Sequence, residues 1–254
     1  MAKKILRILN GLLNTMIAIV LFLAVLYSVY SLWDNFQLYN GVADLKVKLR
    51  ELKPKGDKPS FEELRKINPD VVAWITLDGT KIDEPVVQGK DNLEYLNKDV
   101  YGKYSLGGTI YLDTRCNKKF QDPYSILYGH HMEKHLMFGD LEYYQKPEFA
   151  HKHHTGTLMI PGKKYPLRIF ASMVVKSSDP YLYDPSKYKT DKDDFLNYIN
   201  IKAVWTNDDQ IQKLRSDGSQ YGILAMSTCS ASEADNRTVV LAMYKNKKKG
   251  ETKK

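Results

Sequence analysis

A run of 26 residues without a charged side chain, residues 8–33, constrains this chain more than any other feature of its sequence. An α-helix rises about 1.5 Å per residue, so a helix of this length crosses the roughly 30 Å hydrocarbon core of a bilayer. A cleaved signal peptide is the alternative, but its apolar core normally has about 7–15 residues and ends at a small-residue cleavage site. This run closes with Tyr27, Tyr30 and Trp33, which suit a membrane interface. The sequence therefore predicts an uncleaved transmembrane anchor.

The positive charge of the chain lies at its two ends. Lys3, Lys4 and Arg7 precede the apolar run, and residues 245–254 hold six Lys and one Glu, so the ends account for the whole formal charge of +8. Positive residues mark the cytoplasmic side, which predicts residues 1–7 inside the cell and the rest outside it. The neutral body excludes a basic face for nucleic acid. We expect the 245–254 tail to be solvated, with contact to anionic lipid or wall polymer as the alternative.

Residues 34–244 have the size and composition of one folded domain with helices at its start. Helical spacing covers residues 34–52, and Ser60 with Glu63 forms a capping-box pattern that opens a second short helix. Eight short strands rich in Val, Ile, Leu and Tyr follow, at residues 71–77, 82–87, 108–112, 125–128, 157–160, 166–175, 223–227 and 238–244. Helices are expected at residues 137–144 and 191–204. This pattern predicts a mainly antiparallel barrel or sandwich.

The histidines suggest a metal site at first. They are grouped as His130, His131 and His135, and as His151, His153 and His154. A zincin helix needs Glu directly after its first His, whereas residues 131–135 read HMEKH with the Glu displaced by one position. A structural metal needs four well-placed ligands, and the sequence does not nominate the others. We therefore predict no metal and no other cofactor.

Cys229 lies at the end of a predicted strand, and Arg237 opens the next one. A guanidinium near a thiol favours the thiolate and can stabilise an oxyanion. His130 also follows a predicted strand, so the three side chains could meet at one edge of the sheet. The chain has one other cysteine, Cys116, and a Cys116–Cys229 disulfide is the alternative that these residues leave open.

An ordered set of motifs resembles the class B sortases. It comprises INPDVVAWITLDGTKIDEPVVQGKDNLEYLNKDVYGKYSLGGTIYLD, then YGHHM, FGDL and STC followed by Arg. The segment DKDDFLNYINIKAV, between the sixth and seventh strands, matches the helix-bearing insertion of that class. Three positions depart from the family pattern, Ala225 and Met226 before the nucleophile and His131 after the histidine, and none of them removes a reacting group.

The resemblance implies an eight-stranded sortase barrel at residues 71–244, preceded by helices at 34–70 and the anchor at 8–33. It implies that Cys229, His130 and Arg237 are catalytic. It also implies a substrate groove, lined by Asn92, Leu96, Tyr181, Leu182, Ser227 and Thr228.

An enzyme of this kind cleaves a C-terminal sorting motif after its Thr and transfers the acyl group to an amine. Its expected partners are surface proteins carrying that motif, and a peptidoglycan precursor or cross-bridge amine. The expected location is the cell membrane, with a single span and an extracellular catalytic domain.

Three other functions remain open at this point. A pilin polymerase would use a Lys side chain as the acceptor amine. A non-catalytic extracellular binding domain would keep the barrel with the three residues dispersed or unreactive. A metallopeptidase would require a stoichiometric metal ion.

Overall fold

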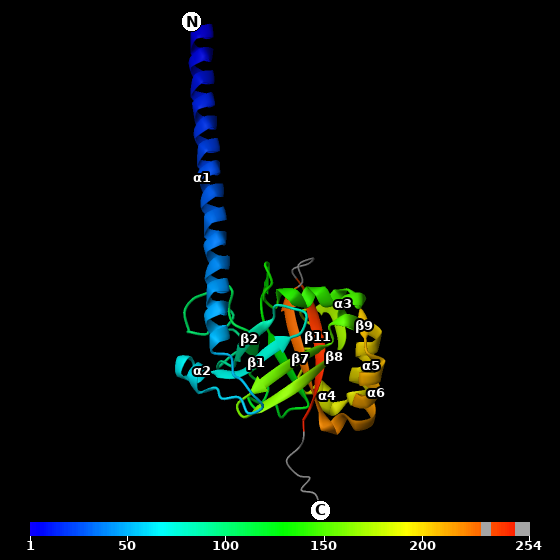
Figure 1. Ribbon diagram of the computed structural model, residues 1–254. Helices are drawn as coiled ribbons and strands as arrows, with labels where there is room; N and C mark the ends of the chain where they lie inside the picture. The colour runs from blue at the N-terminus through cyan, green and yellow to red at the C-terminus, as the bar shows by residue number, and fades with distance from the viewer. Residues whose placement is uncertain (230–234, 247–254) are drawn as a thin grey trace, which may run out of the picture. The chain divides into compact units, whose positions relative to one another are not determined.

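The computed structural model of the chain describes residues 1–229 and 235–246. It divides into two compact units, Met1–Gly41 and Val42–Lys254. Helix α1 (Ala2–Glu51) makes up the first unit and continues into the second (Figure 1). Among the described residues it is the one helix long and apolar enough to cross a membrane. The helix predicted at residues 34–52 is the end of this longer one, and it stops shortly before Pro54, which cannot continue it.

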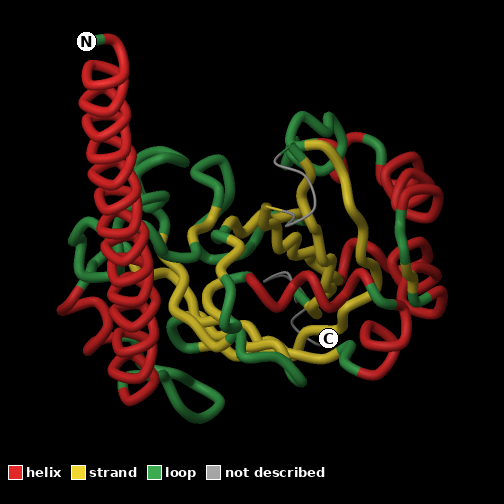
Figure 2. The backbone as a smooth tube through the Cα atoms, turned by 90° about the horizontal axis from the view of Figure 1, so that it is seen from above, coloured by secondary structure: helices red, strands yellow, loops and turns green. Residues whose placement is uncertain are grey.

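Eight strands of the described chain close into a barrel in the second unit. Their order is β11-β10-β4-β3-β2-β1-β7-β8, and a further pairing of β8 with β11 closes the ring. The strands are β1 (Val71–Leu77), β2 (Asp83–Val87), β3 (Tyr111–Leu112), β4 (Tyr124–Tyr128), β7 (Thr155–Ile160), β8 (Lys163–Lys176), β10 (Tyr221–Cys229) and β11 (Asn236–Lys245). Figure 2 shows the strands, in yellow, curving back on themselves with helices outside them. The predicted barrel is confirmed.

Most pairings are antiparallel, but β4 with β10 and β2 with β3 are parallel. Each predicted strand has a counterpart, with ends shifted by up to a few residues. Strand β3 is shorter than predicted, with two residues where five were expected. Gly108, at the start of that prediction, has a φ of +58°, which L side chains rarely adopt and which is incompatible with an extended strand.

The connection between β4 and β7 differs from the helix predicted at residues 137–144. It begins with a hairpin of β5 (His131–Met132) and β6 (Leu136–Met137), followed by the 3₁₀ helix η1 (Gly139–Gln145) and helix α3 (Pro147–Lys152). The helical segment predicted at residues 137–144 corresponds to η1, which begins two residues later because Met137 has a φ of 48°, outside the helical region.

The insertion between β8 and β10 contains more helix than predicted. Helix α5 (Lys192–Lys202) lies inside the predicted range, and its N-cap Asp191 accepts a hydrogen bond from the Asp194 amide. Three further helices surround it: α4 (Lys187–Thr190), α6 (Asp208–Asp217) and the 3₁₀ helix η2 (Gly218–Gln220). Strand β9 (Trp205–Thr206) pairs with β8. In Figure 1, α4, α5 and α6 lie together on one side of the barrel.

The insertion is part of the main core and not an appendage. Phe195, Leu196 and Ile199 of α5 and Leu214 of α6 are fully buried, in one cluster with side chains of β4, β8, β10 and β11. Full burial of a large apolar side chain contributes about 1.5–3 kcal/mol. These helices therefore hold one side of the barrel in place.

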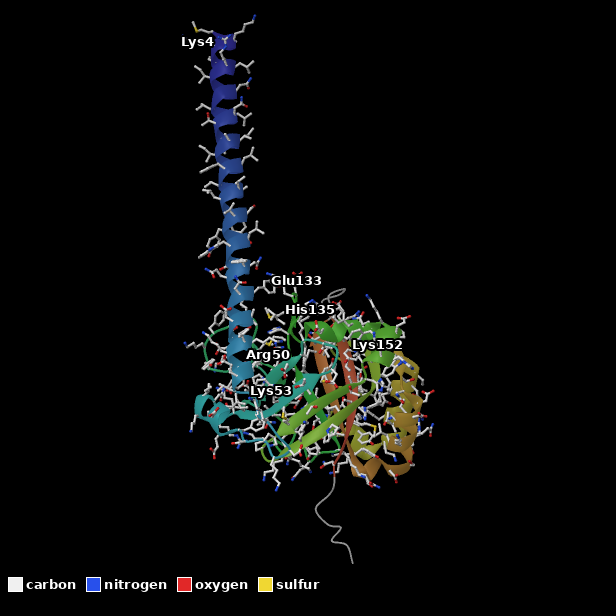
Figure 3. The ribbon with its side chains drawn as sticks, in the orientation of Figure 1. Lys4, Arg50, Lys53, Glu133, His135 and Lys152 are labelled. Carbon is white, nitrogen blue, oxygen red and sulfur yellow. The ribbon has the colours of Figure 1, made fainter. Side chains whose placement is uncertain are left out.

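The last turns of α1 are attached to β2 by charged groups. Lys46 Nζ lies 2.5 Å from Glu84 Oε1, and both side chains are buried. Nearby, Lys53 Nζ lies 2.6 Å and Arg50 Nε 3.6 Å from the carboxylate of Asp83. Figure 3 shows Arg50 and Lys53 at this end of α1. The pair formed by Lys46 and Glu84 fixes the residues from Val42 onward to the barrel.

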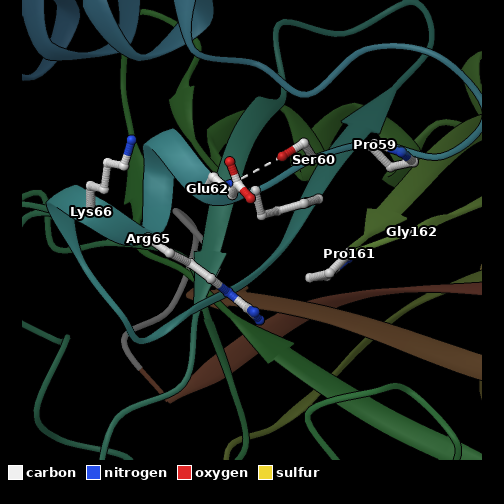
Figure 4. A pocket seen from close by; sticks show the side chains of 8 residues that line it. Pro59, Ser60, Glu62, Arg65, Lys66, Pro161 and Gly162 are labelled. Atoms are coloured by element: carbon white, nitrogen blue, oxygen red, sulfur yellow. Dashed lines mark hydrogen bonds between the residues drawn. The ribbon is translucent and has the colours of Figure 1, made fainter.

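Helix α2 (Glu62–Ile67) begins one residue later than a Ser60 cap would place it. Phe61 is the N-cap, and it makes no side-chain capping bond. The Ser60 hydroxyl instead accepts a 3.4 Å hydrogen bond from the Glu62 amide (Figure 4). Buried Phe61 and Leu64 pack this helix against Trp74 of β1, so apolar packing stabilises it where the cap is weak.

Candidate active site

Strand register brings the three predicted catalytic positions to one edge of the barrel. Strands β4 and β10 run parallel, with Tyr128 opposite Ser227. Parallel strands end at the same edge, so His130, two residues beyond Tyr128, and Cys229, the last residue of β10, lie at that edge together. In the antiparallel pairing of β10 with β11, Arg237 lies opposite Cys229. The described part of the structure includes the backbone of Cys229 but not its side chain.

The ring of His130 is held by a backbone carbonyl. Its Nε2 lies 2.8 Å from the carbonyl oxygen of Leu96, on the connection between β2 and β3. A carbonyl oxygen can only accept, so Nε2 carries a hydrogen and donates it. In the neutral ring the lone pair is therefore on Nδ1, and this nitrogen is the one able to take a proton.

Gly108 allows the Leu96 carbonyl to approach the ring of His130. A Cβ at this position would lie 2.5 Å from the Leu96 carbonyl oxygen and 3.1 Å from Cδ2 of His130. Any larger residue would therefore push the Leu96 carbonyl away from the imidazole. The sequence shows Gly107-Gly108 but gives no signal that they lie against the histidine.

A cleft of about 310 Å³ opens beside these residues. Arg237 lines it together with His130, and an Arg237 guanidinium nitrogen also donates to the Asn236 carbonyl oxygen at 3.0 Å. The other lining residues are Leu96, Tyr111, Tyr128, Gly129, Ser177, Tyr183, Ser227 and Thr228. The cleft thus combines a histidine, an arginine and a wall of aromatic side chains.

Of the predicted groove residues, Leu96, Ser227 and Thr228 line this cleft. The other three do not. Leu182 is buried in the core, 1% exposed, and the ring of Tyr181 stacks on Tyr198 at 4.5 Å.

Asn92 uses both ends of its amide within the fold. Its nitrogen donates to Asp113 at 3.1 Å, and its oxygen accepts from the Thr114 amide at 2.9 Å. Both groups are therefore committed to the loop that follows β3.

Sequence reasoning missed the aromatic wall of the cleft. Tyr111 and Tyr128 pack with ring centroids 5.4 Å apart, and Tyr128 stacks on Tyr183 at 6.3 Å. The Tyr183 hydroxyl lies 2.9 Å from the Ser227 hydroxyl. The only sequence feature that could have pointed to Tyr128 is its position directly before Gly129-His130. Tyr183 had none, because it comes from the distant insertion.

Cys116 is a free thiol buried in the fold, 5% exposed. Burial raises the pKa of this thiol to about 12. Because only the thiolate is a good nucleophile, Cys116 is unreactive at neutral pH. The alternative of a Cys116–Cys229 disulfide does not occur in the structure.

Several histidines interact with carboxylates. His131 Nε2 lies 3.0 Å from Glu142, and His135 Nδ1 lies 2.7 Å from buried Asp140. Within the described residues no group of three or more His, Cys, Asp or Glu side chains is arranged to hold a metal ion.

A second hollow, of about 490 Å³, lies between α2 and the turn joining β7 to β8 (Figure 4). Arg65 and Lys66 line it, and Arg65 Nε donates to the Val71 carbonyl oxygen at 3.1 Å. None of the predicted site residues reaches this hollow.

The proteins that this chain resembles are class B sortases, which are cysteine transpeptidases. No protein-family model matches this chain. Sortase B of Staphylococcus aureus is 35% identical over 187 residues, which are 73% of this chain and 74% of that protein. A Streptococcus pyogenes class B sortase involved in pilus biogenesis is 37% identical, covers 73% of this chain and 97% of its own, and superposes with a TM-score of 0.66.

The S. aureus sortase B–substrate complex is 32% identical and covers 84% of this chain and 94% of its own, also with a TM-score of 0.66. The extent and identity of these matches are sufficient to assign a family. The chain belongs to the sortase B family.

Proposed function

We propose that this chain is an extracytoplasmic transpeptidase that cleaves a C-terminal sorting motif after Thr and joins the acyl group to an amine of peptidoglycan. The observation that carries the proposal is the strand register, which brings Cys229, His130 and Arg237 to one edge beside a cleft. Membership of the sortase B family supports the reaction class. The proposal keeps residues 71–244 as the catalytic domain.

In the proposed reaction, the Cys229 thiolate attacks the Thr carbonyl carbon. The carbonyl bond opens to a tetrahedral oxyanion and then re-forms as the C–N bond breaks, leaving a thioester. His130 gives its proton to the departing amine. The incoming amine then attacks the thioester, His130 takes the proton that this amine loses, and Cys229 leaves as thiolate.

The carbonyl oxygen of Leu96 supports His130 in this role. It accepts from Nε2, so the proton exchanged with substrate is the one on Nδ1. Leu96 is thus a positioning residue that acts through its backbone.

Arg237 is proposed to stabilise the tetrahedral oxyanion. It lies across the strand pair from Cys229 and lines the cleft with His130. Removal of a single oxyanion donor typically costs about 3 kcal/mol in the transition state.

The apolar helix supports a location of the proposed reaction at the cell envelope. Helix α1 is apolar enough to span a membrane, and the basic residues Lys3, Lys4 and Arg7 precede the span. By the positive-inside rule, we propose a cytoplasmic N-terminus and an extracellular barrel. Peptidoglycan amines and exported proteins are both available on that side.

A pilin polymerase is the second candidate. The similar S. pyogenes class B sortase is involved in pilus biogenesis. The chemistry up to the thioester is the same for both candidates, and only the acceptor differs, a pilin Lys in place of a peptidoglycan amine.

The test is a transfer reaction with the full chain in detergent micelles. Peptides carrying varied sorting motifs are incubated with peptidoglycan-derived amines and with a Lys-containing peptide, and products are identified by mass. We expect ligation by the native chain and none by the Cys229→Ala variant. Turnover retained in Cys229→Ala would refute the assigned nucleophile, and transfer only to the Lys peptide would favour the pilin polymerase.

A further inference from the structure

A buried carboxylate, Asp113, lies directly behind the aromatic wall of the cleft. Its side chain is 0% exposed. Arg115 donates to it from its backbone amide at 2.9 Å, from Nε at 2.9 Å and from a terminal guanidinium nitrogen at 2.7 Å. The amide of Asn92 donates at 3.1 Å and the hydroxyl of Tyr128 at 3.0 Å. Five donors from three parts of the chain converge on one side chain.

Asp113 is ionised in this environment. Burial by itself raises the pKa of its carboxyl, but the hydrogen bonds from Arg115 and Tyr128 outweigh that effect and leave the pKa below its ordinary value. Burial raises the pKa of the Tyr128 hydroxyl, and the Asp113 charge raises it further. Tyr128 is therefore a permanent donor to Asp113, and its ring is fixed in one orientation.

Arg115 extends this network to the insertion. The guanidinium nitrogen that contacts Asp113 also donates to the Tyr183 carbonyl oxygen at 2.9 Å. Tyr183 in turn places its ring against Tyr128 and its hydroxyl against Ser227. Asp113 is therefore connected to the aromatic wall in two ways. It accepts a hydrogen bond from Tyr128 directly, and it is linked to Tyr183 through Arg115.

The parts of the wall joined in this way are far apart in the sequence. Tyr128 ends β4, Tyr183 follows β8, and Ser227 lies near the end of β10. All three line the cleft. The Arg115 bridge to the Tyr183 carbonyl oxygen therefore adds to two other contacts between the insertion and the barrel strands here, the Tyr183–Ser227 hydroxyl pair and the hydrogen bond from the Tyr124 hydroxyl to the Leu182 carbonyl oxygen.

We propose that Asp113, acting through Arg115 and Tyr128, is a positioning residue for peptide binding, because it fixes the wall against which the sorting peptide lies. This inference rests on the function proposed above. The wall contacts the peptide chain and not the reacting atoms. Loss of the network therefore weakens peptide binding and leaves the chemical steps nearly unchanged.

The central variant is Asp113→Asn, which keeps the shape of the side chain but removes its charge and turns an NH₂ group toward its donors. We expect KM for the peptide to rise by about tenfold or more while kcat changes by less than about threefold, the pattern of lost binding. The rate at which iodoacetamide alkylates Cys229 should not change. An equal fall in kcat with KM unchanged would overturn the proposal.

Arg115→Gln is the second variant, because the Arg115 side chain is about half exposed and the fold should tolerate its loss better. It should also raise KM. The matched control is Arg215→Gln, which removes an arginine that contacts Asp193 and Asn197 in the insertion away from the cleft. The control should keep the native KM. A control that raises KM as much as Arg115→Gln would show that the insertion, and not this network, is responsible.

Amide hydrogen exchange of residues 177–185 separates this inference from the proposed function. It should accelerate in Asp113→Asn and Arg115→Gln and stay native in Arg215→Gln, whether or not any peptide is turned over. A native chain that ligates no peptide would refute the proposed function. Unchanged exchange in both network variants would refute the role of Asp113 independently.

Discussion

Replacing Lys46 with Met tests how strongly the end of α1 is fixed to the barrel. The Lys46 and Glu84 side chains are 8% and 4% exposed, and Lys46 also donates to the Lys81 carbonyl oxygen at 2.6 Å. The variant leaves Glu84 as a buried charge without its partner. This should lower the free energy of unfolding by about 3–5 kcal/mol. At roughly 2–4 °C per kcal/mol for a domain of this size, Tm should fall by about 6–20 °C.

The loss of stability in Lys46→Met should be smaller at low pH than at high pH. Burial raises the pKa of Glu84 above its ordinary 4.5 even though Lys46 opposes the shift, and removal of Lys46 raises it further. A carboxyl with a raised pKa in the folded state stabilises the fold at low pH, and that contribution is lost as the pH rises through the folded-state pKa. The variant should therefore be less destabilised at pH 5 than at pH 8.

The assay is denaturant unfolding of the full chain in micelles, followed by fluorescence of Trp74, which is fully buried and donates to Asp83 at 2.7 Å. Lys48→Met, an exposed neighbour on the same helix, should change stability by less than about 0.5 kcal/mol. Adding Glu84→Gln to Lys46→Met should recover most of the loss. Equal losses in the Lys46 and Lys48 variants, or a loss independent of pH, would refute the reasoning.

Two further predictions concern the site. Cys116→Ala should keep ligation activity near the native level in the transfer assay, because the buried thiol has a pKa of about 12 and does not line the cleft. A large loss of activity would show that Cys116 takes part in the reaction. Gly108→Ala should lower kcat at least about tenfold, because its Cβ would displace the Leu96 carbonyl that holds His130. Gly102→Ala is the matched control, since its φ is also positive but its Cβ would meet no atom within 4 Å, and an equal kcat loss there would attribute the effect to backbone strain alone.

The sequence was sufficient for features whose physical signal is local. An uncharged run predicts a spanning helix, and runs of β-branched and aromatic residues between turns predict strands, because each depends only on neighbours along the chain. The number and spacing of these strands predicted a barrel or a sandwich, and the resemblance to class B sortases implied the barrel. The prediction that Cys229 ends a strand is confirmed by β10, whereas its catalytic role stays a prediction.

Local signals also failed where the backbone departs from its usual conformations. Met137 adopts a positive φ within a hydrophobic segment that resembles a helix, and Gly108 has a positive φ at the start of the strand predicted at residues 108–112. Helix α6 was not predicted although its N-cap Asn207 and acidic first turn are present in the sequence. The conformations of these residues depend on the packing around them, which a local sequence pattern does not record.

The sequence by itself determined the long apolar helix, the strands and the candidate catalytic residues Cys229 and His130. Only the tertiary structure decided that the Leu96 carbonyl holds His130, that Leu182 lies in the core, and that Asp113 gathers donors from three segments. The physical reason is sequence separation. Tyr128, Tyr183 and Ser227 meet through strand register and packing, and no pattern of neighbouring residues records which distant side chain will complete a contact.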